Sequence, residues 1–220
     1  MSFYLPKTPS IIRRFFSNYI WRFSLEKKEI YLTFDDGPTV EITEFVLNEL
    51  KKYNAKATFF CIGKNAQQHP EIFKKIRING HTIGNHTQQH LNGWKTDRNA
   101  YVENVLECEQ NITIILDQTQ ELETERTAPK LFRPPYGKMK KSQTIALLKK
   151  GYKIIMWDVL SADFDEKIHK EKCLQNVLEN TQNGSIIVFH DSKKAAEKLK
   201  FVLPIVLAEF SSQGFVFKAI

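Results

Sequence analysis

Two adjacent carboxylates, Asp35 and Asp36, follow an apolar run at residues 30–34 and come directly before Gly37 and Pro38. The run is rich in strand-forming residues, which is typical of a strand covered on both faces. Gly37 and Pro38 then end the strand and turn the chain. Two carboxylates side by side at a strand end are costly, because like charges repel and loss of hydration opposes ionisation. A metal ion or a basic partner would relieve both costs; a water-exposed turn is the alternative.

His86 and His90 are four positions apart. If they lie on one helical turn, they share a face and can bind one metal ion from the same side. Asp36 supplies a third ligand, and a set of one aspartate and two histidines leaves positions open for water and substrate. This donor set predicts one divalent ion, with Zn²⁺ the best fit and Co²⁺, Ni²⁺ or Mn²⁺ still open. The alternative is a pair of partly exposed histidines that bind nothing.

Segments typical of strands and helices alternate along the chain. Strands are expected near residues 30–35, 56–63, 81–84, 131–132, 152–159, 185–189 and 215–220. Helices are expected over residues 40–53, 70–79, 97–118, 142–150, 170–181 and 192–211, the last with a bend near Pro204. This alternation predicts parallel strands joined by crossover helices. The residues capable of chemistry follow the strands, and in a barrel of parallel strands active sites are built at the carboxyl ends.

The composition indicates a single globular domain. The chain has 220 residues, of which 42% are hydrophobic and 26% charged, with a formal net charge of +7. The lysines are spread along the chain, which favours a solvated basic surface over a dedicated site for an anionic substrate or membrane. The sequence has no nucleic-acid-binding motif. Its three cysteines are widely spaced and form no Cys-x-x-Cys, so neither a disulfide framework nor a thiolate zinc site is expected.

Residues 1–28 form a basic and aromatic segment that includes Arg13, Phe15, Phe16 and Trp21. We expect the aromatic side chains to pack on the domain and the arginines to stay in water; peripheral contact with a membrane surface is the alternative. There is no recognisable signal peptide, and no run approaches the ~20 apolar residues of a membrane span. These features favour a cytoplasmic location and leave the cell envelope open.

Four motifs occur in a fixed order along the chain. They are Thr33-Phe34-Asp35-Asp36-Gly37-Pro38, His86-Thr87-Gln88-Gln89-His90, Arg133-Pro134-Pro135-Tyr136-Gly137 and Val188-Phe189-His190-Asp191. Together they resemble the motifs of the polysaccharide deacetylases of carbohydrate esterase family 4, the NodB-homology domain. The resemblance covers residues 29–220 and leaves residues 1–28 outside. It implies an α/β fold, a distorted (β/α) barrel of seven or eight parallel strands with its active site at the C-terminal ends of the strands.

The resemblance also implies roles for individual residues. The Asp-His-His set would hold the metal, which lowers the pKa of a bound water. Asp35 would be the catalytic base, and Arg133 would pair with it and keep it ionised and oriented. The backbone N–H of Tyr136 would stabilise the oxyanion. His190 would protonate the departing amine, because an amide nitrogen leaves poorly without that proton.

Two family motifs depart from their usual form, one at residues 157–164 and the one that begins at Val188. Asp163 aligns with the aspartate that orients the acid histidine, with Asp158 as the alternative. Phe164 stands where the family usually has tryptophan, and Val188 where it usually has leucine, so an apolar acetyl pocket is kept but loses an indole N–H. Trp94 would line the cleft as a sugar-stacking surface or, equally, pack in the core.

The sequence therefore predicts a hydrolase acting on carbon–nitrogen bonds other than peptide bonds. Its substrate would be an N-acetylated amino-sugar polysaccharide or oligosaccharide. A metal-dependent amidohydrolase or esterase acting on a non-carbohydrate or O-acetyl substrate is the first alternative, motivated by the missing secretion signal. A catalytically silent glycan-binding protein is the second, although the ligands, the base and the acid are all present. The sequence specifies neither the glycan nor the oligomeric state.

Overall fold

The computed structural model describes residues 5–117 and 129–220. Its strands are β1 (Tyr19–Ile20), β2 (Glu29–Asp35), β3 (Ala57–Cys61), β4 (Thr82–Asn85), β5 (Lys130–Phe132), β6 (Tyr152–Ile155), β7 (Val159–Leu160), β8 (Ile186–His190) and β9 (Val216–Phe217). Its helices are α1 (Ser10–Phe15), α2 (Ile42–Lys52), α3 (Gly63–Gln68), α4 (Pro70–Ile78), α5 (Arg98–Asp117), α6 (Lys141–Lys149), α7 (Lys170–Leu178) and α8 (Ala196–Ser212), with a 3₁₀ turn at Pro135–Gly137. No helix in these ranges is long and apolar enough to cross a membrane.

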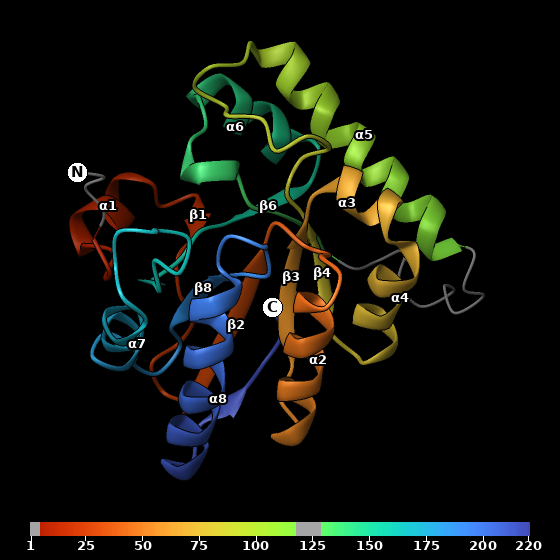
Figure 1. Cartoon of the computed structure of the whole chain (residues 1–220). Coiled ribbons are helices and arrows are strands. Elements are labelled where there is room, and N and C mark those ends of the chain that lie inside the picture. Colours follow the sequence, from red (N-terminus) through yellow and green to blue (C-terminus); the bar gives the residue numbers. More distant parts are fainter. Residues whose placement is uncertain (1–4, 118–128) are drawn as a thin grey trace.

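The strands form one sheet in the order β1-β6-β5-β4-β3-β2-β8-β7, with β9 added beside the start of β2. Every pairing between these strands is parallel. The sheet curls into a half-barrel, and the helices lie on its outside, with α2 and α8 near its centre (Figure 1). The predicted distorted barrel of seven or eight parallel strands is confirmed, with eight strands along the path.

β2 lies at the centre of the sheet, between β3 and β8. Ile30, Leu32 and Phe34 point to one face and are fully buried in the core between the sheet and the helices. Thr33 and Asp35 point to the opposite face, because side chains alternate along a strand. In the parallel register Asp35 lies beside His190 of β8. The pattern of β2 thus brings a carboxylate next to a histidine at the carboxyl edge.

The single strand predicted over residues 152–159 is wrong, because the structure has two strands, β6 and β7, separated by residues 156–158. The main chain changes partners in this gap. Met156 N donates a hydrogen bond to Ile20 O at 2.7 Å, whereas Asp158 N donates to Ile186 O at 3.0 Å. The chain therefore leaves the β1 side of the sheet and joins β8.

Asp158 contacts the N-terminal segment and not His190, the candidate general acid. Its fully buried carboxylate accepts hydrogen bonds from Lys7 Nζ at 2.6 Å and from Arg13 Nη1 at 2.7 Å. Ser185 Oγ donates to the same carboxylate at 2.7 Å. Because two cations meet one buried anion, the start of the chain is tied to the gap between β6 and β7.

The N-terminal segment extends both ends of the sheet. β1 pairs with β6, and Lys7 forms an antiparallel bridge with Val159 of β7. Trp21 is buried, and its Nε1–H donates to Phe16 O. Phe15 and Phe16, by contrast, present exposed rings, and Arg13 is paired instead of free in water.

Candidate active site

Asp36, His86 and His90 come together beyond the carboxyl ends of β2 and β4, with all their ligand atoms within 4.8 Å of one another. Asp36 Oδ1 lies 3.2 Å from His90 Nε2 and 3.7 Å from His86 Nε2. This buried oxygen has no hydrogen-bond partner among the described residues. A divalent cation would satisfy it, and one carboxylate with two imidazoles is a donor set that such ions bind. The three residues therefore fit a divalent metal ion.

The surroundings of His86 determine which ring nitrogen faces the cluster. Its Nδ1 lies 2.8 Å from Arg133 O, so the ring N–H at that position donates to the carbonyl. Nε2 is left without a proton and faces Asp36. Burial lowers the pKa of His86 to about 4, so the imidazole stays neutral, which is the form that binds metal.

Residues 86–90 form a loop, so the helical turn considered from their spacing is wrong. Thr87 and His90 have φ angles of 66° and 56°, in the left-handed region. That conformation costs about 1–2 kcal/mol for a residue with a Cβ. Hydrogen bonds from Thr87 N to Asn85 Oδ1 and from Leu91 N to Thr87 Oγ1 stabilise the loop. The two imidazoles converge because of this turn, with ring centroids 5.1 Å apart.

Asp35 is buried and paired with Arg133, whose side chain has no exposed surface. Arg133 Nη1 donates to Asp35 Oδ1 and to Thr33 Oγ1, both at 2.7 Å. The other contacts of the guanidinium are the carbonyl oxygens of Met156 and Ile155, at 2.9 and 3.2 Å, and the ring of Phe60. Because its donors are held on several sides, Arg133 fixes the position of the Asp35 carboxylate and supplies its counter-ion.

His190 is held by Asp163 through two hydrogen bonds. His190 Nδ1 lies 2.7 Å from Asp163 Oδ1, and His190 N donates to Asp163 Oδ2 at 2.7 Å. Burial disfavours the imidazolium, but the charge and hydrogen bond of Asp163, with smaller contributions from Asp36 and Asp35, raise the pKa of His190 to about 10. Of the two aspartates that the sequence left open, Asp163 contacts the histidine and Asp158 contacts the N-terminal segment. His190 is thus a protonated donor facing the cluster at neutral pH.

Asp191 supports the site in a way that the sequence analysis missed. Its buried carboxylate accepts hydrogen bonds from Gly37 N at 3.0 Å and from Thr43 Oγ1 at 2.5 Å. A Cβ at Gly37 would lie 2.0 Å from this carboxylate, so glycine is required for the close approach. Burial raises the pKa of Asp191 to about 7, although Thr43 and the Gly37 N–H act in the opposite direction. Its place directly after His190, at the end of β8, was the available signal.

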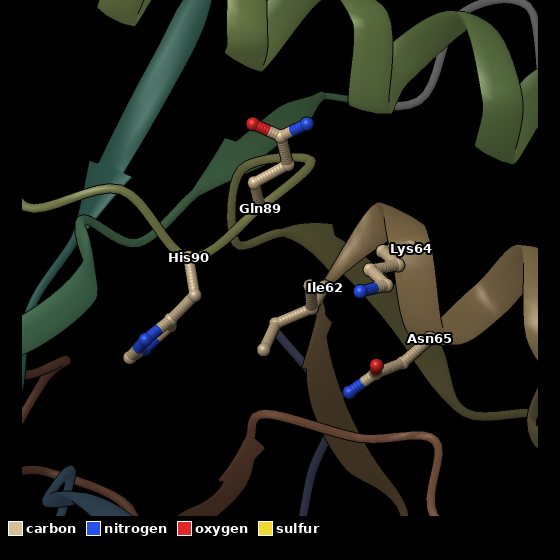
Figure 2. Close-up of a pocket in the computed structure, with 5 residues that line it drawn as sticks. All are labelled: Ile62, Lys64, Asn65, Gln89 and His90. Atoms are coloured by element: carbon tan, nitrogen blue, oxygen red, sulfur yellow. The ribbon is translucent and has the colours of Figure 1, made fainter.

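A cavity of about 450 Å³ lies beside His90. Figure 2 shows Ile62, Lys64 and Asn65 along one side of it and the ring of His90 on the other, with the Gln89 amide pointing away. Asn65 Nδ2 donates to Asp36 O at 2.7 Å, so this wall also supports the metal-ligand cluster. No sequence motif identified Asn65, because its partner lies 29 positions away.

The residues expected to line the substrate site occupy different environments. The exposed Tyr136 ring lies 4.6 Å from the His90 ring, centroid to centroid, and its backbone φ of 60° is in the left-handed region. Phe164 packs edge-on against His190 at 5.1 Å. Val188 is buried in β8, two positions before His190 and on the same side of the strand. Trp94 is 60% exposed, so it does not pack in the core, and Lys138 Nζ lies 5.1 Å above its ring.

The arrangement suits metal-assisted hydrolysis of an acyl compound. A set of metal ligands, a buried carboxylate and a protonated histidine surround the carboxyl ends of β2, β4 and β8. The carboxylate can accept a proton from water, and the histidine can donate one to a leaving group.

Comparison with known proteins agrees with this chemistry. The family model described as polysaccharide deacetylase matches residues 24–155. A peptidoglycan-N-acetylglucosamine deacetylase of Bacillus cereus is 36% identical over 176 residues, which cover 79% of this chain and 60% of the relative. The chain thus spans less than two thirds of that relative's length. A chitooligosaccharide deacetylase of Azorhizobium caulinodans is 34% identical over 170 residues, which cover 77% of each chain.

The solved structures extend the similarity to the fold. The crystal structure of the Bc1960 peptidoglycan N-acetylglucosamine deacetylase superposes with a TM-score of 0.84 at 30% sequence identity, covering 97% of this chain and 95% of the other. BA3943, a CE4 family pseudoenzyme from Bacillus anthracis, has the same fold, with a TM-score of 0.78 at 23% identity over 91% of this chain and 66% of the other.

Proposed function

Because the chain belongs to the polysaccharide deacetylase family, carbohydrate esterase family 4, we propose that it hydrolyses the N-acetyl groups of amino sugars in a glycan. The observation that carries this proposal is the meeting of the Asp-His-His cluster, the Arg133-paired Asp35 and the Asp163-held His190 at one edge of the sheet. Peptidoglycan is the substrate we favour, since relatives with that activity by name match most of the chain; chitooligosaccharides come next.

Asp36, His86 and His90 are the residues that would hold the metal ion, which we propose to be Zn²⁺. When bound, such an ion supplies a water of lowered pKa and polarises the acetyl carbonyl. The neutral state of His86 and the tautomer set by Arg133 O prepare the site for this ion before it binds.

Asp35 is the proposed general base. Its carboxylate accepts the proton of the attacking water while the new C–O bond forms at the acetyl carbon. The hydrogen bond from Arg133 Nη1 keeps this carboxylate in place. The backbone N–H of Tyr136 would donate to the oxyanion that develops on the acetyl oxygen.

His190 is the proposed general acid. The C–N bond breaks as Nε2 of the imidazolium gives its proton to the amine nitrogen, so the products are acetate and a free amino sugar. The Asp163 carboxylate forms hydrogen bonds with Nδ1 and with the backbone N–H of His190. Nε2 of His190 is therefore the ring nitrogen that is free to donate. Phe164 and Val188 would form the apolar wall for the acetyl methyl group, and Trp94 and the cavity beside His90 would receive neighbouring sugars.

The decisive experiment measures acetate release from N-acetylglucosamine oligomers and peptidoglycan fragments. Chelator-stripped protein should release none, and restoring a divalent ion should return the activity, with Zn²⁺ compared against Co²⁺, Ni²⁺ and Mn²⁺. We expect His90→Ala to lose both metal binding and activity, since it removes one of the three ligands. His169→Ala, at an exposed histidine before α7, is the matched control and should lose neither.

The outcomes separate the parts of the proposal. Release only from non-carbohydrate amides or O-acetyl esters would reject the glycan substrate but keep the hydrolase. Protein that binds metal by calorimetry yet releases acetate from no substrate would reject the enzyme altogether. Restoration by another ion but not by Zn²⁺ would reject zinc alone.

The link between Asp163 and His190 predicts a shift in the pH profile. The pKa of His190 lies above its ordinary value, so the acid is protonated through neutral pH and is lost only as the pH rises through about 10. Asp163→Asn removes the charge that raises this pKa. The alkaline limb of the kcat/KM profile should therefore move to lower pH, by about one unit or more. If the rate falls equally at every pH and the alkaline limb does not move, Asp163 does not set the pKa of His190. Asp165→Asn, two positions along the chain, is the control and should leave the alkaline limb where it is in wild type.

A further inference from the structure

Five large apolar side chains near the start of the described chain are exposed. They are Leu5, Ile11, Ile12, Phe15 and Phe16, and we call them the α1 face. α1 buries none of its residues, and Phe15 is 78% exposed. Positions three and four apart on a helix are neighbours, so Ile11, Ile12 and Phe15 form one continuous surface. Monomeric proteins seldom leave such a patch uncovered unless it binds something.

The α1 face is held outward by specific contacts. Arg13 Nη1 lies 2.7 Å from the buried Asp158 carboxylate, and Thr8 N donates to Asp158 O at 2.9 Å. On the other side, Trp21 Nε1–H donates to Phe16 O at 3.0 Å. These contacts fix both ends of α1, so the apolar face is already in position before any partner arrives.

Basic side chains adjoin the α1 face. An open hollow of about 460 Å³ beside α1 is lined by Arg13, Arg14 and Arg22, together with Tyr19 and Trp21, and none of the described carboxylates lines it. Arg13 shares the Asp158 carboxylate with Lys7, whereas Arg14 and Arg22 form no ion pair with the described residues. Two guanidinium groups without an ion-pair partner in the described part of the chain favour an anion, and guanidinium matches the geometry of phosphate.

We propose that α1 docks on the surface of an anionic lipid bilayer, with the α1 face at the boundary between headgroups and acyl chains and with Arg14 and Arg22 on lipid phosphates. The charge favours this partner over a second copy of the chain. A two-fold dimer through the α1 face would bring like arginines together, whereas an anionic bilayer attracts them. The formal net charge of +7 adds long-range attraction to such a surface.

The test uses the full chain and co-sedimentation with vesicles of phosphatidylcholine alone or mixed with phosphatidylglycerol. We expect binding to the anionic vesicles, weakened by high salt. Phe15→Ser combined with Phe16→Ser should weaken this binding about tenfold or more, because two buried rings are lost from the interface. Arg14→Gln combined with Arg22→Gln should weaken it and reduce its dependence on salt.

Matched controls use exposed residues elsewhere. Ile78→Ser with Val216→Ser removes equally exposed apolar side chains, and Arg98→Gln removes an exposed charge; both should leave vesicle binding unchanged. No binding to anionic vesicles, or equal losses in the controls, would overturn the proposal. Sedimentation velocity gives a further test. If the protein self-associates and the Phe15/Phe16 double variant does not, the α1 face binds a second copy of the chain and the proposal is overturned. Vesicle binding needs no catalysis, so this test and the test of the proposed function fail separately.

Discussion

Asp35→Asn should reduce kcat by about 10²–10⁴-fold while the metal stays bound, because the amide cannot take the proton of the attacking water. The metal should remain because Asp36, His86 and His90 are the proposed ligands and Asp35 is not among them. Steady-state acetate release, together with metal content measured on the same protein, checks both parts. An asparagine oxygen can still accept the hydrogen bond from Arg133 Nη1, so the geometry around the site should change little.

Asp117→Asn is the matched control for this prediction. Asp117 is exposed at the end of α5, and the same change of side chain there should leave turnover and metal content at the wild-type level. Wild-type turnover in Asp35→Asn would remove Asp35 from the role of base. Loss of metal from that variant would instead place Asp35 in the ligand set.

Arg133→Met should lower the free energy of unfolding by about 3–5 kcal/mol, because it leaves the buried Asp35 carboxylate without its counter-ion. The same change also removes the hydrogen bonds that Arg133 donates to Thr33 Oγ1 and to two backbone carbonyls. Urea unfolding followed by circular dichroism measures the loss. Arg98→Met, at an exposed arginine at the start of α5, should change stability by no more than about 0.5 kcal/mol.

A double variant separates charge from packing at Arg133. If the unpaired carboxylate is the main cost, adding Asp35→Asn to Arg133→Met should recover part of the lost stability. Losses that simply add would show that the two side chains stabilise the fold independently, contrary to the pairing seen here. Arg133→Lys keeps the positive charge but not the forked geometry of the guanidinium. Its free energy of unfolding should therefore lie between those of wild type and Arg133→Met.

The sequence alone predicted the structural features that depend on the local pattern of apolar and polar residues. The apolar run of β2 predicted its burial, and its end at Asp35 and Asp36 predicted where the carboxylates lie. The alternation of strands and helices predicted the parallel sheet, and a parallel sheet brings strand ends to one edge. His86, Arg133 and His190 follow or end their strands for the same reason.

The features that the sequence did not predict depend on contacts between distant segments. The loop at residues 86–90 owes its shape to left-handed residues, which a four-residue spacing cannot distinguish from a helical turn. The break between β6 and β7 depends on a change of partner from β1 to β8. The sequence favoured Asp163 over Asp158 as the partner of His190 without excluding Asp158. In the structure Asp163 contacts His190, and Asp158 contacts Lys7 and Arg13.

The pairing of Lys7 with Asp158 and Val159 also constrains the order in which the protein can fold during synthesis. The first described residues leave the ribosome early, but their partners lie 151 positions later in the chain. The central strands β2, β3 and β4 can pair while the chain is still growing, because domains generally fold from the N-terminus as they are made. The contacts that Lys7 makes with Asp158 and Val159 therefore cannot form until residue 159 has been made. The segment around Lys7 is thus among the last of the described residues to reach its native place.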